Sequence, residues 1–119
     1  NSATFPWGMV RILRQLGFSA RWRLLARPQD LQRVNTKGLI LVTITGQWSP
    51  LWAHYMILVA LDPHRGLGFI NPALPQADID WQPQVRFDKE WSAFGRQLVE
   101  IRLNSRAYFD KSNSSVTGQ

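Results

Sequence analysis

Two long apolar segments follow each other in the middle of this chain, and they constrain its fold more than any other feature. The first, Leu39–Thr45, is rich in β-branched residues and has apolar side chains on both faces, as a strand in the centre of a sheet does. The second, Trp52–Leu61, follows a break at Gly46–Pro50. Neither segment reaches the roughly 20 apolar residues of a membrane-spanning helix. The two segments therefore predict a sheet with a buried central strand, and no transmembrane span.

Shorter elements flank these two strands. Turn-forming residues at Asp62–Gly66 end the second segment, so that Leu67–Ile70 returns as its hairpin partner. The other predicted elements are, in order, a helix from Pro6 to a stop at Gly17, a strand over Phe18–Leu25, a short helical turn over Pro28–Val34, an irregular loop over Asn71–Pro83, a short helix or turn over Phe87–Phe94, and a last strand over Gln97–Leu103.

The length of the chain is that of a single domain. With 119 residues it can bury a sizeable core but is too short for two independent ones, as two domains would need. We expect residues 1–111 to form one α+β domain, in which an N-terminal helix packs on a mostly antiparallel sheet. The small, polar residues 112–119 are expected to form a flexible tail.

The chain is basic, with 14 Lys and Arg, 8 Asp and Glu, and a net charge of +6. Several of the arginines lie between Arg11 and Arg33, which favours acidic partners in general. Arginine stems also shield apolar surface while their charged ends stay in water. Because no helix-turn-helix, ribonucleoprotein or zinc-finger pattern accompanies them, we predict no nucleic-acid partner.

Few residues in this chain can carry chemistry. There is no cysteine, which excludes disulfides, thiolate metal sites and a cysteine nucleophile within these residues. The acidic residues lack the spacing and histidines of a metal site, so we predict neither a metal nor a cofactor. Of the two histidines, His64 lies in a turn typical of solvent-exposed residues, whereas His54 begins an otherwise apolar strand, where a buried ring needs a polar partner.

Asn71 is the candidate partner of His54. A hairpin folded about His64 pairs residues whose numbers add to about 128, which places Asn71 opposite Ile57, about 10 Å along the strand from His54. A register shift of one or two residues brings the amide within reach of the imidazole. In nucleophilic catalysis an Asn or Asp fixes the tautomer and orientation of a His general base. A His and an Asn on adjacent strands are also an ordinary structural pair, so both interpretations stay open.

Four aromatic residues lie near the candidate histidine in the sequence. They are Trp48, Trp52, Tyr55 and Trp81. Together they can line a groove for an extended peptide, and core packing is the simpler alternative.

The order of these segments resembles one known family. The runs PWGMVRILRQLGFSARW, LQRVNTKGLILVTI, WAHYMILVALDPHRGLGFINPA and FDKEWSAFGRQLVEI are similar to the papain-like bacteriocin-leader peptidases, the cysteine peptidase domains at the N-terminus of peptide-exporting ABC transporters. The resemblance covers about residues 6–101. It implies a papain-like half-domain in which His54 and Asn71 correspond to the catalytic His and its Asp or Asn, and Phe87 and Trp91 to the segment before the last strand.

The cysteine of that family has no counterpart here. In one alignment, Pro6–Gly17 matches the second helix of the family, and the cysteine helix would precede Asn1. In the other, Thr4 takes the position of the nucleophile. We favour the first, because the chain from Leu16 to Leu39 is too short to hold the second helix. A threonine hydroxyl stays protonated near neutral pH and needs far stronger activation than a thiol.

The resemblance implies two functions. The first is a catalytically inactive leader-peptidase-like domain that binds a peptide or protein, in which His54 and Asn71 are vestigial. The alternative is part of an active cysteine peptidase whose cysteine helix lies outside these residues. The family also implies a bacterial protein, cytoplasmic if it is like the transporter domains, with a larger membrane-associated or transport assembly as its partner.

Overall fold

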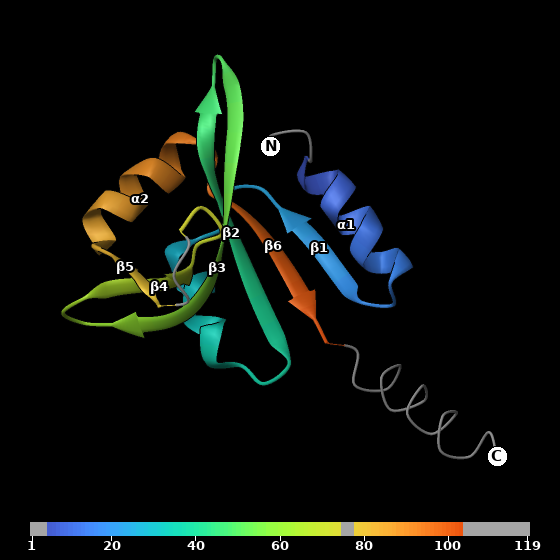
Figure 1. Cartoon of the computed structure of the whole chain (residues 1–119), viewed down its shortest axis with the longest axis horizontal. Helices are drawn as coiled ribbons and strands as arrows, with labels where there is room; N and C mark the ends of the chain where they lie inside the picture. Colours follow the sequence, from blue (N-terminus) through green and yellow to red (C-terminus); the bar gives the residue numbers. More distant parts are fainter. Residues whose placement is uncertain (1–4, 75–77, 104–119) are drawn as a thin grey trace.

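The computed structural model describes residues 5–74 and 78–103. The helices are α1 (Pro6–Gln15), the 3-10 helix η1 (Pro28–Asn35) and α2 (Gln84–Ala93). The strands are β1 (Ser19–Arg23), β2 (Leu39–Trp48), β3 (Leu51–Asp62), β4 (Gly66–Ile70), β5 (Asp80–Gln82) and β6 (Gln97–Arg102) (Figure 1). No helix within the described ranges has both the length and the apolar character to cross a membrane. The predicted tail, residues 112–119, and residues 104–111 of the predicted domain lie outside these ranges.

The six strands form one sheet in the order β1-β6-β2-β3-β4-β5, and all the neighbouring pairs are antiparallel. β2 lies between β6 and β3, so the prediction of a central strand is confirmed. The α+β class and the mostly antiparallel sheet are confirmed as well. The central position of β2 follows from its side chains, because a strand that is apolar on both faces needs cover on both.

Two strands differ from the sequence prediction. β2 continues through Gly46 to Trp48, so that the interruption expected at Gly46–Pro50 is reduced to the turn at Ser49 and Pro50, and the end of the β2–β3 hairpin projects beyond the rest of the sheet (Figure 1). β5 lies within the segment that was predicted as an irregular loop. A three-residue strand gives too short an alternation to recognise, and it forms here because the edge of β4 pairs with it.

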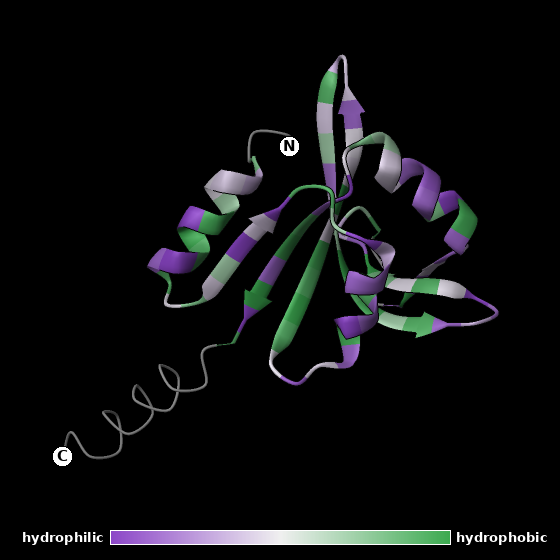
Figure 2. Ribbon diagram, turned by 180° about the vertical axis from the view of Figure 1, so that it is seen from behind, coloured by the Kyte–Doolittle hydropathy of each residue, from purple (hydrophilic) through white to green (hydrophobic). Residues whose placement is uncertain are grey.

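The sheet carries a core on each face. On one face, η1 and α2 cover a cluster that comprises Ala26, Leu31, Leu39, Leu41, Met56, Leu58, Leu67, Phe69, Phe87, Trp91 and Leu98. On the other face, α1 packs on a cluster that comprises Val10, Ala20, Val42, Ile44, Phe94, Val99 and Ile101. Figure 2 shows apolar stretches along the central strands of the sheet, whereas α1 and α2 contain both polar and apolar residues. The alternation of side chains along each strand separates the two clusters.

The β3–β4 hairpin contains a bulge. Leu58 pairs with Phe69 and Ala60 pairs with Gly68, so that Val59 has no counterpart in β4. One extra residue on β3 shifts the register by one position beyond the bulge. This shift decides which face of the sheet Asn71 occupies, as described below.

Gly66 is required at the start of β4. Its φ is +93°, and a Cβ atom there would collide with the carbonyl oxygen of Gln82 at the end of β5. We therefore expect Gly66→Ala to lower the free energy of unfolding by about 2 kcal/mol, because left-handed strain of roughly 1–2 kcal/mol adds to the loss of close β4–β5 packing. Urea unfolding followed by circular dichroism measures this loss.

A second glycine provides the matched control. Gly8 lies inside α1, and a Cβ atom there would meet no atom of residues 5–74 and 78–103 within 4 Å. Gly8→Ala should raise the free energy of unfolding by about 0.5–1 kcal/mol, because alanine favours the helix. Equal effects of the two substitutions would contradict the role assigned to Gly66.

Candidate functional site

His54 lies near the start of β3, where it pairs with Thr45 of β2. Its side chain is half-buried. Because side chains alternate along a strand, it shares a face with Met56, the face that η1 and α2 cover. The sequence prediction of an apolar strand around His54 is confirmed.

The structure brings His54 and Asn71 together. The bulge at Val59 places Ile70, the last residue of β4, opposite Ile57. The same register extended by one residue sets Asn71 in line with Met56 rather than with Ile57. This one-residue shift moves the Asn71 side chain to the face that carries His54. The imidazole Nε2 of His54 then lies 2.8 Å from the Oδ1 atom of Asn71.

The hydrogen bonds of Asn71 assign the tautomer of His54. The Oδ1 atom of Asn71 accepts the backbone N–H of Ala73 at 3.0 Å, and the Nδ2 atom donates to Asp80 at 3.0 Å. With the amide oriented in this way, Oδ1 can only accept from the imidazole. The neutral ring of His54 therefore carries its proton on Nε2, and Nδ1 is its acceptor nitrogen.

Asp80 anchors this arrangement from β5. Its Oδ2 atom accepts hydrogen bonds from Asn71 and from the Nε2 atom of Gln82, both at 3.0 Å. These two bonds, that from Asn71 first, outweigh partial burial and hold the pKa of Asp80 below its ordinary value. The side chains of His54, Asn71 and Asp80 thus form a line from an imidazole through an amide to a carboxylate. In nucleophilic enzymes the group in direct contact with the imidazole, a carboxylate or an amide, orients the general base, and Asn71 has that position here.

The sequence prediction missed Asp80 and Gln82 as site residues. Both side chains lie on the His54 face of the sheet, since they pair with Phe69 and Leu67 of the core on that face. The alternation of Asp80, Trp81 and Gln82 is the only local signal, and it is too short to distinguish a strand from a loop.

A cavity of about 590 Å³ opens in front of His54. His54, Asn71, Trp52, Met56 and Gln82 contribute from the sheet. The helix α2 contributes three charged side chains, namely Arg86, Lys89 and Glu90. The cavity therefore combines an imidazole, two amides and an aromatic ring on the sheet side with charged groups on α2.

The four aromatic residues predicted to line a groove are divided between the two faces of the sheet. Trp52 lines the His54 cavity, whereas Tyr55 packs against the core on the opposite face. Trp48 stacks on Phe94 with ring centroids 4.4 Å apart, and Trp81 lies under the guanidinium of Arg65. Residues an odd number of positions apart on one strand point to opposite faces, which is why Trp52 and Tyr55 separate.

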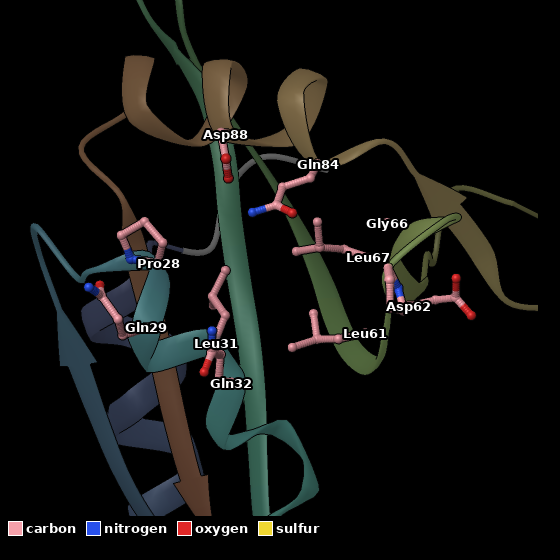
Figure 3. Close-up of a pocket in the computed structure, with 11 residues that line it drawn as sticks. Pro28, Gln29, Leu31, Gln32, Leu61, Asp62, Gly66, Leu67, Gln84 and Asp88 are labelled. Atoms are coloured by element: carbon pink, nitrogen blue, oxygen red, sulfur yellow. The ribbon is translucent and has the colours of Figure 1, made fainter.

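A second cavity, of about 650 Å³, lies on the other flank of α2 (Figure 3). Asp88 and Gln84 reach from α2 toward the space between η1 and the β3–β4 hairpin, where Leu31 and Leu67 form apolar walls. Burial raises the pKa of Asp88. His54 and Asn71 do not line this cavity, and no residue in it was a candidate from the sequence.

The candidate nucleophile position Thr4 lies outside the described residues. The helix α1, which follows it, packs on the face of the sheet opposite His54. Across residues 5–74 and 78–103, no three His, Asp or Glu side chains are grouped closely enough to hold a metal ion.

Comparison of the chain with models of known protein families finds no match, and comparison with curated proteins finds none either.

Proposed function

We propose that this domain is a papain-like, leader-peptidase-related module without a nucleophile, and that it binds an extended peptide or a peptide segment of a partner protein in the His54 cavity. The observation that carries the proposal is the 2.8 Å contact between Nε2 of His54 on β3 and Oδ1 of Asn71, the residue after β4, at the wall of a cavity. The resemblance of the sequence to the bacteriocin-leader peptidases supports the same interpretation.

The residues around the cavity favour binding over catalysis. The sequence contains no thiol. Thr45, which pairs with His54 across β2 and β3, carries a hydroxyl and lines the cavity, but no hydrogen bond joins it to the imidazole in the part of the chain that the structure describes. A hydroxyl without a general base in contact stays protonated and is a weak nucleophile.

The polar groups of the cavity match the chemistry of a peptide. Nδ1 of His54 accepts a main-chain N–H, and the ring of Trp52 provides an apolar surface for a side chain. Arg86 and Lys89 place two cations on the opposite wall, where they attract an acidic side chain or a terminal carboxylate. Glu90 lies 3.9 Å from Arg86, and both side chains are largely exposed, so this ion pair competes only weakly with a ligand.

The test is a titration with a synthetic leader peptide that ends in Gly-Gly. We expect saturable binding by calorimetry, and a saturable change in the ring ¹⁵N shifts of His54. The first variant is Arg86→Gln. Because the side chain of Arg86 is exposed, this substitution leaves the core intact. It should weaken binding about tenfold, which corresponds to one lost charge-assisted hydrogen bond. Asn71→Ala should weaken binding further and alter the ¹⁵N shifts of the free protein, because the tautomer is no longer held.

The second histidine is the matched control. His64 lies in the exposed β3–β4 turn, so His64→Ala should leave peptide affinity unchanged. Binding that His54→Ala and Arg86→Gln do not weaken would sink the proposal. Cleavage of the peptide by the purified chain, abolished in His54→Ala, would show an enzyme rather than a binding module.

The same hydrogen bond favours one alternative. A histidine whose Nε2 is held by an amide, and whose side chain lines a cavity, is the arrangement that can activate a cysteine thiol. The alternative function is therefore a cysteine peptidase that receives its thiol from a segment outside these residues. A form of the protein that carries such a cysteine, reacts with iodoacetamide and cleaves the Gly-Gly peptide would establish this function in place of the first.

A further inference from the structure

A groove of about 560 Å³ runs between α1 and β1, far from the His54 cavity. Trp7, Arg11 and Arg14 line it from α1, at a spacing that places them on one stripe of the helix. Arg21 and Trp22 line it from β1. Arg14 spans the two elements, because its Nε atom donates to the backbone oxygen of Ala20 at 3.0 Å. Figure 1 shows α1 beside β1 at the edge of the sheet, on the opposite side of the molecule from α2.

No carboxylate of the described residues neutralises the cations of this groove. The first acidic residue of the chain is Asp30, so α1 and β1 contain none. Glu100 lies beside β1, but it is buried and already bound by Arg23 and Arg33. Within the described ranges, Arg11, Arg14 and Arg21 form no ion pair. The groove is therefore a patch of uncompensated positive charge.

Apolar side chains project into solvent from the same helix and from the residue that ends it, Leu16. Trp7 is 60% exposed, Ile12 53% and Leu16 60%. Phe5, just before the helix, is 42% exposed and stacks on Trp7 with the two rings 5° from parallel. Aromatic and aliphatic side chains beside arginines on one helix are the composition of helices that lie in a membrane interface.

We propose that the α1–β1 surface binds anionic phospholipid membranes. The guanidinium groups of Arg11 and Arg14 bind phosphate oxygens of the headgroups, and Trp7, on the same stripe, enters the boundary between headgroups and acyl chains. Ile12 and Leu16 add apolar contact from a separate stripe, roughly 100–140° further round the helix. The net charge of +6 draws the domain to an anionic surface. The protruding aliphatic side chains favour a lipid surface over nucleic acid, which would leave Ile12 and Leu16 in water.

The test is cosedimentation with vesicles of phosphatidylcholine alone and with 30% phosphatidylglycerol. We expect binding to the anionic vesicles only, weakened by added salt. The double variant Arg11→Gln/Arg14→Gln should lower the partition coefficient about thirtyfold, or about fivefold for each cation. Acyl-chain-brominated lipids should quench the tryptophan fluorescence, and Trp7→Phe should remove most of this quenching.

The matched control removes two charges elsewhere. Lys37 lies in the turn before β2 and Arg65 in the β3–β4 turn, and Lys37→Gln/Arg65→Gln should retain most of the vesicle binding because neither residue is near the groove. Equal losses in the two double variants would show a net-charge effect and overturn the proposal. Equal binding to both vesicle types would also overturn it. So would a protein that binds free phosphate or a DNA oligonucleotide through Arg11 and Arg14 but does not bind vesicles.

Discussion

Replacement of Trp91 by alanine is expected to remove about 4 kcal/mol from the free energy of unfolding, a large part of the 5–15 kcal/mol that holds a domain of this size folded. The side chain of Trp91 is fully buried, and its ring centroid lies 5.5 Å from that of Phe87. Its Nε1 donates to the backbone oxygen of Gln97 at 2.8 Å. Truncation opens a cavity under α2 and also leaves that buried carbonyl without its donor.

Thermal and urea unfolding measure the effect of Trp91→Ala. We expect the midpoint of thermal unfolding to fall by about 15 °C or more. Trp91→Phe, which keeps a ring beside Phe87 but loses the N–H, should cost about half as much. The exposed Trp7 is the control, since Trp7→Ala should change the free energy of unfolding by less than about 0.5 kcal/mol. A Trp91→Ala protein as stable as the Trp7→Ala protein would contradict the central place of Trp91 in the core.

The second large effect is expected at Glu100 of β6. The side chain of Glu100 is only 7% exposed, and its Oε2 atom accepts from Arg23 at 2.7 Å and from Arg33 at 3.0 Å. Arg23 also reaches Asp30, so that the cluster ties β1 and η1 to β6. Glu100→Ala should lower the free energy of unfolding by about 3 kcal/mol, because the partly buried guanidinium of Arg33 loses its carboxylate partner and that of Arg23 keeps only Asp30.

The Glu100 cluster also predicts the response to acid. Burial raises the pKa of Glu100, but the hydrogen bonds from Arg23 and Arg33 outweigh it and hold the pKa below its ordinary value of 4.5. The pKa of Asp30 is also lowered, first by the backbone N–H of Arg27. A carboxyl group with a lowered folded pKa stabilises the fold above its unfolded pKa, and this stabilisation is lost as the pH falls through the folded value. Stability should therefore fall below about pH 4.5.

Glu100→Gln isolates the ionic part of this effect. The amide keeps an acceptor in the same position but cannot ionise. We expect its deficit in stability to be largest near neutral pH and to shrink as the pH falls below about 4. Equilibrium unfolding of both proteins from pH 3 to pH 7 measures the difference. A deficit that does not vary with pH would mean that the charge of Glu100 contributes little.

Local pattern was sufficient for most of the elements. The β-branched run from Leu39 predicts the central strand, and the helical spacing after Pro6 predicts α1. Both predictions need only neighbouring residues, because apolar side chains recur with a different period in a strand than in a helix. β5 was missed because a three-residue strand has almost no period of its own and depends on the edge of β4.

Some residues of the candidate site could be predicted from the sequence, and others could not. His54 and Asn71 were identified as candidates from their neighbours in the sequence. Asp80, Gln82 and the charged side chains of α2 were not, because they reach the site through strand pairing and helix packing. Trp52 lines the cavity and Tyr55 does not, although both are close to His54 in the sequence. A side chain on β3 shares a face with His54 only if an even number of positions separates the two residues.

The amino-acid sequence by itself determined the α+β class, the central strand and the pairing of β3 with β4, because each depends on alternation and turn residues close together in the chain. Only the tertiary structure decided that Asn71 meets His54. The bulge at Val59 changes the register by one residue, and one residue in a strand is the difference between the two faces of the sheet. The register of β4 against β3 depends on how several strands pair in the sheet. No short stretch of the sequence therefore predicts which face Asn71 occupies.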